Sequence, residues 1–160
     1  MKKGLVLAVG NSLMGDDGAG PLLAELMKEK PIQGWDVIEG ELVPENMVHL
    51  LRDRSPQRVL VVDASDMDLP PGTTCLINDD MLADPFFITT HTLPLTFLIE
   101  AIRDFVPKVD LLGIQPELIA FGYPMSSSVR GAVHQLYLQL AAGNPEWETL
   151  IPVGVIGEIG

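Results

Sequence analysis

The chain has 160 residues, a length that fits one globular domain and leaves no room for a second. With 47% hydrophobic residues, this domain can form a substantial core. Ten basic residues against 22 acidic ones leave a formal net charge of -12, which disfavours nucleic acid and anionic membrane surfaces as partners. No apolar run approaches the roughly 20 residues that span a bilayer, so no membrane insertion is expected. Cys75 is the single cysteine, which rules out an internal disulfide and favours a cytoplasmic location.

The predicted elements alternate between strands and helices. In chain order they are a strand at 5–9, a helix beginning near Ala19, a strand at 35–40, a helix at 44–54, strands at 58–64 and 73–78, a helix beginning near Leu93, a strand at 108–114 and a helix at 129–140. The runs at 5–9 and 58–64 are continuously apolar, as in strands of a parallel sheet that is covered on both faces. The helix near Leu93 is predicted from the helical spacing of Leu95, Leu98, Ile102 and Phe105.

This alternation predicts the fold class. We expect a three-layer α/β/α domain whose mostly parallel, doubly wound sheet has about five strands. The domain is expected to occupy residues 1–142. The stretch at 143–160 is rich in Gly and Pro without a clear period, and it is expected to be an irregular or mobile tail.

A glycine-rich loop, GNSLMGDDGAG, follows the first predicted strand and carries two adjacent acids. Asp16 and Asp17 stand where the phosphate-binding P-loop requires Lys and Ser or Thr. Ser12 stands where the dinucleotide fingerprint requires its second glycine. Phosphate binding is therefore disfavoured, and the acids are left with two uses, capping the following helix or binding a cation. We expect Asp16 to cap the following helix, and we expect this role less for Asp17.

Two further candidate ligands lie at comparable positions. Asp63 closes the strand at 58–64, and the first and third strands of a doubly wound sheet are often neighbours beside the ligand crevice. His91 immediately precedes the helix predicted near Leu93, whereas His49 and His134 lie within predicted helices and are interpreted as structural. Two carboxylates and one imidazole suit Ni, Zn, Fe or Mn. A turn or capping role for Asp63 remains an alternative.

Four separated motifs carry a family resemblance. The segments VGNSLMGDDGAGPLLAE, VVDASDM, TTHTLPLTFLI and LGIQPE…GYPMS resemble, in this order, those of the hydrogenase maturation endopeptidases, and most of all the type that serves the large subunits of formate hydrogenlyase (hydrogenase 3). The resemblance runs from about Leu5 to about Leu140 without a large gap. It does not extend into the C-terminal stretch.

The resemblance implies an enzyme that removes a C-terminal extension from the precursor of the [NiFe]-hydrogenase large subunit after nickel has been inserted. The family's metal-binding positions fall on Asp17, Asp63 and His91, with Asp17 and Asp63 nearest the reaction and Asp16 in support. The nickel is expected to arrive with the precursor, and the site is expected to accept zinc or cadmium in its place. The domain at 1–142 would then be catalytic, and a monomer is expected.

Other functions are compatible with single features of the sequence. A nickel-binding chaperone or checkpoint would recognise the same precursor without cutting it. A peptidyl-tRNA hydrolase would need a basic face, which the net charge argues against. A thiol protease built on Cys75 and His91 is disfavoured because Cys75 lies inside a predicted strand, where cysteine is usually a small buried hydrophobe. No serine stands in a G-x-S-x-G elbow.

Overall fold

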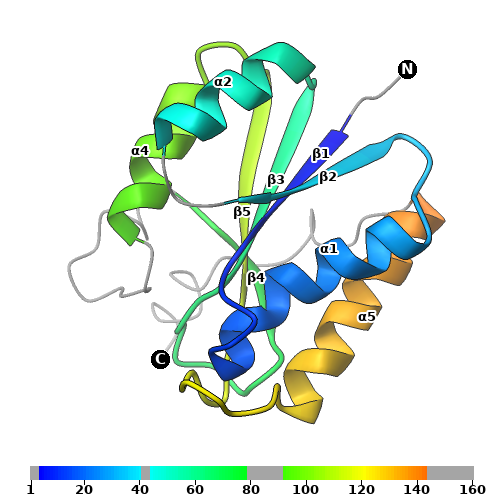
Figure 1. Ribbon diagram of the computed structural model, residues 1–160, viewed down its shortest axis with the longest axis vertical. Coiled ribbons are helices and arrows are strands. Elements are labelled where there is room, and N and C mark those ends of the chain that lie inside the picture. Colours follow the sequence, from blue (N-terminus) through cyan, green and yellow to red (C-terminus); the bar gives the residue numbers. More distant parts are fainter. Residues whose placement is uncertain (1–3, 41–43, 79–91, 144–160) are drawn as a thin grey trace, which may run out of the picture.

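The computed structural model describes residues 4–40, 44–78 and 92–143 as an α/β fold with a five-stranded sheet (Figure 1). The strands are β1 (Gly4–Val9), β2 (Trp35–Gly40), β3 (Arg58–Ala64), β4 (Thr74–Ile77) and β5 (Lys108–Ile114). The sheet order is β2-β1-β3-β5-β4. The first four strands in that order run parallel, and β4 pairs antiparallel with β5 at the edge. All five predicted strands and the mostly parallel sheet are therefore confirmed.

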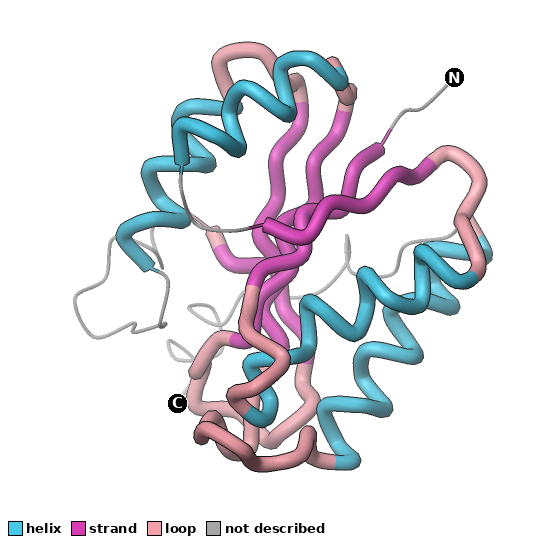
Figure 2. Tube along the Cα trace, viewed as in Figure 1, coloured by secondary structure: helices cyan, strands magenta, loops and turns pink. Residues whose placement is uncertain are grey.

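Four helices cover the two faces of this sheet. They are α1 (Ala19–Glu29), α2 (Pro44–Arg54), α4 (Thr92–Ile102) and α5 (Ser127–Ala142), and a short 3-10 helix, η1 (Gly15–Gly18), precedes α1. Helices α1 and α5 lie on one face of the sheet, and α2 and α4 lie on the other (Figures 1 and 2). The three-layer architecture expected from the sequence is thus confirmed. Within the described residues, no helix is both long and apolar enough to cross a bilayer.

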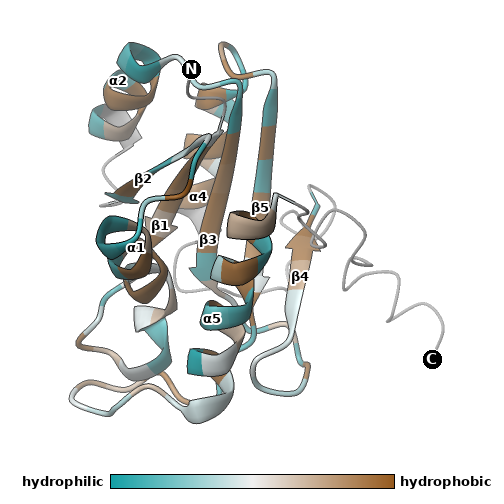
Figure 3. Ribbon diagram, turned by 90° about the vertical axis from the view of Figure 1, so that its right-hand side faces the viewer, coloured by the Kyte–Doolittle hydropathy of each residue, from teal (hydrophilic) through white to brown (hydrophobic). Residues whose placement is uncertain are grey.

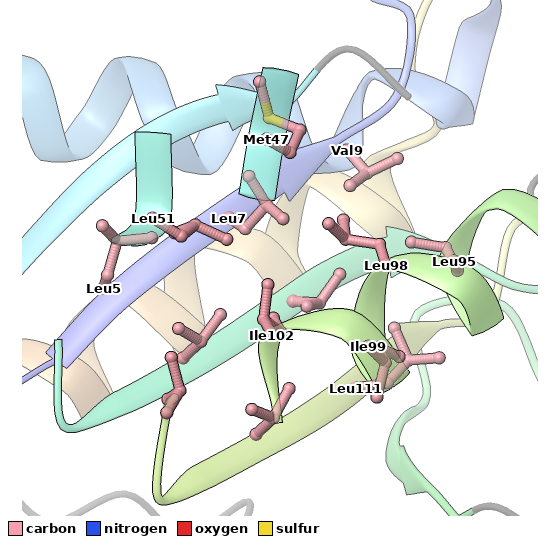
Figure 4. Packing of buried hydrophobic residues seen from close by; sticks show 14 of the residues in the cluster. Leu5, Leu7, Val9, Met47, Leu51, Leu95, Leu98, Ile99, Ile102 and Leu111 are labelled. Carbon is pink, nitrogen blue, oxygen red and sulfur yellow. The ribbon is translucent and has the colours of Figure 1, made fainter. Parts of the chain in front are cut away.

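The hydrophobic core has two parts, one on each side of the sheet. Figure 4 shows the part beneath α2 and α4, where Leu7 and Val9 of β1 pack with Met47 of α2 and Leu98 of α4. The part beneath α1 and α5 contains alternate residues of the same central strands, including Val6. Because β1 and β3 are apolar on both faces, they appear brown along most of their length in Figure 3. Burial on both sides explains their continuous apolar sequence.

Two details differ from the sequence expectations. The pattern that predicted the helix near Leu93 extended to Phe105, but α4 ends at Ile102 and the chain continues as a turn. Val106 precedes Pro107, and a residue before proline is sterically disfavoured in helical conformation. Phe105 nevertheless packs against the core. The tail expected at 143–160 lies outside the described residues from position 144 onward.

The topology brings three loops together at the carboxyl ends of the parallel strands. Because β1, β3 and β5 are parallel neighbours, the loops that follow them emerge at the same edge, which is the lower end of the molecule in Figures 1 and 2. From β1 the chain crosses to β2 on one side, whereas from β3 it continues to strands on the other side. Ligands of open α/β sheets bind at such a switch point.

Candidate active site

The loop after β1 folds back on itself before entering α1. Gly10 has φ +142°, and a Cβ placed on it would lie 2.0 Å from the backbone oxygen of Asp17. Glycine is therefore required at this position by both the backbone angle and the space. The Asn11 side-chain oxygen accepts a hydrogen bond from the Leu13 N–H at 2.9 Å, and the Asp17 N–H donates to the Met14 oxygen at 3.2 Å. These contacts fix the position from which Asp17 projects.

Asp17 is buried, and its two oxygens have different surroundings. Oδ2 accepts a hydrogen bond from the Asn11 backbone N–H at 2.8 Å. Oδ1 is also buried but has no hydrogen-bond partner among the described residues. Buried polar atoms without partners are uncommon because each carries the cost of its lost hydration. Asp17 Oδ1 is therefore a candidate ligand atom, since carboxylate oxygens are donors that divalent cations accept.

Asp16 binds a loop that is distant in sequence, a role that local sequence patterns did not predict. Its carboxylate is fully buried and accepts hydrogen bonds from the backbone N–H groups of Glu117, Leu118 and Ser126 at 2.8, 3.1 and 2.6 Å. The Ser126 hydroxyl donates a fourth bond at 2.9 Å. The expectation that Asp16 caps its own helix is wrong, since neither η1 nor α1 has a side-chain cap. Asp16 instead joins the loop after β1 to the loop before α5.

Asp63 lies near the end of β3, next to the strand from which the Asp17 loop leaves. It is fully buried, and its register partner on β5 is Gly113. The 3-10 helix that contains Asp17 contacts β3. The two acids predicted as ligands thus lie where neighbouring strands end, Asp63 within β3 and Asp17 in η1 after β1.

Gln115 organises the loop that follows Asp63, a role that sequence reasoning missed. Its Oε1 accepts hydrogen bonds from the backbone N–H groups of Met67 and Leu69 at 2.6 and 3.3 Å, and its Nε2 donates to Asp66 at 3.1 Å. The sequence showed only that Gln115 follows the predicted strand at 108–114 inside the segment LGIQPE, and its burial is visible only in the structure. Gln115 and Asp16 together tie the loops after β1, β3 and β5 into one unit.

The sequence also contains three histidines and one cysteine, and the structure describes two of the histidines and the cysteine. His91 lies outside the described residues, and the described residues contain no group of three or more His, Cys, Asp or Glu side chains that could hold a metal ion. His49 and His134 are exposed on α2 and α5, on opposite faces of the sheet. Cys75 is buried in β4, where desolvation raises the pKa of its thiol. A thiol nucleophile needs the opposite shift, so the interpretation of Cys75 as a small buried hydrophobe is confirmed.

Comparison with known proteins identifies the class. A family model described as hydrogenase maturation protease matches residues 21–142. The hydrogenase 3 maturation protease of Escherichia coli K12 is 46% identical over 136 residues, which cover 85% of this chain and 87% of that protein. The chain therefore belongs to the hydrogenase maturation proteases, and it is an endopeptidase of that family rather than a peptidyl-tRNA hydrolase.

Solved structures agree with this assignment. A crystal structure of a hydrogenase 3 maturation protease superposes with a TM-score of 0.84 at 41% identity, covering 95% of this chain and 97% of the other. A [NiFe] hydrogenase maturation protease from Thermococcus kodakarensis superposes with a TM-score of 0.75 at 25% identity, covering 89% and 92%. The sheet and helices described above are thus those of the family.

Proposed function

We propose that this chain is a nickel-dependent endopeptidase that removes the C-terminal extension of a [NiFe]-hydrogenase large-subunit precursor once nickel has been inserted. Family membership supports the protease activity, and the relative from Thermococcus kodakarensis is described as a [NiFe] hydrogenase maturation protease. The observation that carries the nickel dependence is Asp17 Oδ1, a buried carboxylate oxygen without a hydrogen-bond partner in the described part of the chain. A cation in the substrate would supply the missing partner.

In this proposal Asp17, Asp63 and His91 contact nickel that belongs to the substrate. Two carboxylates and one imidazole leave coordination positions open for the precursor's own ligands or for water. The ion is therefore part of what is recognised, and zinc or cadmium would occupy the same donor set. A precursor without nickel would lack the group that these side chains bind, so recognition and readiness for cleavage would coincide.

The reaction is hydrolysis of one peptide bond. A water molecule adds to the carbonyl carbon, its proton passes to a carboxylate, and the C–N bond breaks as that proton reaches the leaving amine. We propose that Asp17 and Asp63 are the acids that lie closest to the reacting atoms. The divalent ion of the substrate would polarise the carbonyl or lower the pKa of the water.

The decisive experiment mixes the purified chain with nickel-loaded and with nickel-free precursor and follows the precursor by mass spectrometry. We expect loss of a C-terminal peptide from the loaded precursor alone. Equal cleavage of both forms would reject the nickel dependence. Stable binding of the loaded precursor with unchanged mass would instead favour the chaperone that the sequence left open.

The same proposal includes a cellular setting and an assembly state. Processing would occur in the cytoplasm, where a single buried thiol, Cys75, stays reduced. The catalytic unit would be residues 1–142 acting as a monomer, which size-exclusion chromatography with light scattering would test. A stable dimer at micromolar concentration would reject the monomer.

A further inference from the structure

The loops beside Asp17 expose large hydrophobic side chains to solvent. Four large hydrophobic side chains are strongly exposed there, namely Leu13 (62%), Leu118 (47%), Phe121 (74%) and Tyr123 (57%). They come from two segments, the turn at 11–15 after β1 and the segment at 117–125 before α5. We call these four residues the rim patch. Large apolar side chains that gather in this way mark interaction sites more often than isolated exposed ones do.

Hydrogen bonds hold the two segments of the rim patch together. The Gly122 N–H donates to the Leu13 oxygen at 2.9 Å, and the Asp16 N–H donates to the Leu118 oxygen at 3.0 Å. The buried Asp16 carboxylate adds its bonds to Glu117, Leu118 and Ser126. The patch is therefore presented on a fixed framework, which lowers the entropy cost of binding.

Phe121 stands at the tip of a turn that exposes it. The Tyr123 N–H donates to the Ala120 oxygen at 3.2 Å, and Gly122 has φ +79°, the positive value that the third position of a type II turn requires. Phe121 and Tyr123 thus flank a glycine with no neighbour within 4 Å of its Cβ position. The turn projects into solvent, so a partner can reach both rings without any rearrangement.

The charge distribution indicates what kind of partner fits. The chain has a net charge of -12, yet no residue from Leu118 to Val129 and none from Gly10 to Gly15 carries a charge. A basic partner would find no complement in these segments, whereas an uncharged apolar protein surface would. Beside the patch lies a groove of about 720 Å³, which Tyr123 and Met125 line on the side of the patch and which also has charged side chains in its lining, among them Glu25 and Arg130. The groove is therefore of mixed character, and the uncharged area is the rim patch itself.

We propose that the rim patch is the docking surface for the precursor protein, and that it binds an apolar, uncharged area of the folded precursor. This inference rests on the proposed function, since it assigns the partner of the same site. Leu13 lies in the loop that contains Asp17, so a partner seated on the patch is held beside the candidate catalytic acids. The patch supplies affinity, and the acids act on the bond presented to them.

The test compares exposed aromatic and aliphatic residues inside and outside the patch. Phe121→Ser and Tyr123→Ser remove patch side chains, and Phe97→Ser and Leu138→Ser remove side chains of similar exposure, 65% and 58%, from α4 and α5. With nickel-loaded precursor we expect each patch variant to raise KM about 10-fold, as loss of an interface anchor does, with kcat unchanged. The two control variants should keep the wild-type KM. Tyr123→Phe, which keeps the aromatic ring, should also have the wild-type KM.

A binding measurement separates this inference from the proposed function. The dissociation constant of the nickel-loaded precursor is measured by calorimetry for Asp17→Asn and for the double variant Asp17→Asn/Phe121→Ser, in which cleavage is slow. A wild type that never cleaves would reject the proposed function, while weaker binding by the double variant would still support the docking surface. Patch variants with wild-type KM and Kd, or control variants that lose as much, would overturn the inference even where cleavage is normal.

Discussion

Asp16 and Ser126 join two loops across 110 positions of sequence. Asp16 Oδ1 accepts a hydrogen bond from the Ser126 backbone N–H at 2.6 Å, and Oδ2 accepts one from its hydroxyl at 2.9 Å. Ser126 is also the residue that caps α5, because its Oγ accepts from the Val129 N–H. The acid beside the candidate catalytic Asp17 therefore fixes both the start of α5 and the segment at 117–125.

Asp16→Asn should destabilise the fold. The carboxylate accepts from three backbone N–H groups, and the Asn amide would turn a donor toward at least one of them. We expect the free energy of unfolding to fall by about 3 kcal/mol, since bonds to charged groups and unsatisfied buried donors both weigh heavily. Urea denaturation measures this. The exposed Asp104→Asn serves as control and should change stability by less than about 0.5 kcal/mol.

Asp17→Asn should have the opposite profile, with the fold intact and processing lost. Its amide oxygen can still accept the Asn11 N–H, and its amino group would occupy the place of Oδ1, which has no partner among the described residues. We expect stability within about 1 kcal/mol of wild type. Release of the C-terminal peptide should be at least about 100-fold slower, because changes in residues that only support metal ligands already cost about 10- to 100-fold.

Further variants complete that test. Asp63→Ala and His91→Ala should also abolish processing, whereas Asp17→Glu keeps a carboxylate and should retain part of the activity. Precursor mass over time gives the rates, and circular dichroism confirms folding. Full activity in the His91 variant would remove that residue from the ligand set.

Local sequence patterns were sufficient for the strands and for their grouping at one edge. The segment at 58–64 is continuously apolar because β3 is covered on both faces, and it ends in Asp63 as expected. The antiparallel direction of β4 was missed. The connection from β3 to β4, residues 65–73, contains no helix, and a parallel crossover needs a dozen or more residues. The length of that connection was the available signal.

The contacts of Asp16 could not be predicted from the sequence. Its partners lie 101 to 110 positions away, so no local spacing links them, and an acid at the start of a helix suggests capping by frequency alone. The same limit applies to Gln115, whose bonds to Met67 and Leu69 cross 48 and 46 positions. Long-range polar contacts become visible only once the sheet order brings the loops together.

Cys75→Ala should retain processing. The thiol is buried in β4 and packs in the core beneath α2 and α4, and burial raises its pKa, so it is a poor nucleophile. We expect wild-type cleavage rates and a loss of stability of about 1 to 2 kcal/mol from the small cavity. Rates are compared at a temperature where both proteins are folded. A variant that folds but does not cleave would return Cys75 to the mechanism.

The same thiol predicts a pH dependence of stability. Burial raises the pKa of Cys75 above its ordinary value of 9.0, so the unfolded chain loses this proton at lower pH than the folded one. Well below pH 9.0 the thiol is protonated in both states, and as the pH rises through 9.0 the free energy of unfolding falls, by at most about 1.4 kcal/mol per pH unit. Other titrating groups cancel between wild type and Cys75→Ala. Urea midpoints should therefore decline more steeply above pH 9 in wild type, and parallel curves would contradict the assignment.

Two helical glycines should respond oppositely to alanine. A Cβ on Gly20, in the first turn of α1, would lie 2.4 Å from the Val9 oxygen and 2.8 Å from its nitrogen, both backbone atoms of β1. We expect Gly20→Ala to cost about 2 kcal/mol or more, because the helix must move away from the strand. Asp17 lies three residues earlier, so processing by the folded variant should slow as well.

Gly131 is the matched control for that change. It lies in α5, is exposed, and has nothing within 4 Å of its Cβ position. Gly131→Ala should therefore raise the free energy of unfolding by about 0.5 to 1 kcal/mol through helix propensity, with unchanged processing. Thermal denaturation of the two variants should shift the midpoint in opposite directions. A Gly20 variant as stable as the Gly131 variant would show that α1 can retreat from β1 freely, and that this close contact does not hold the Asp17 loop in place.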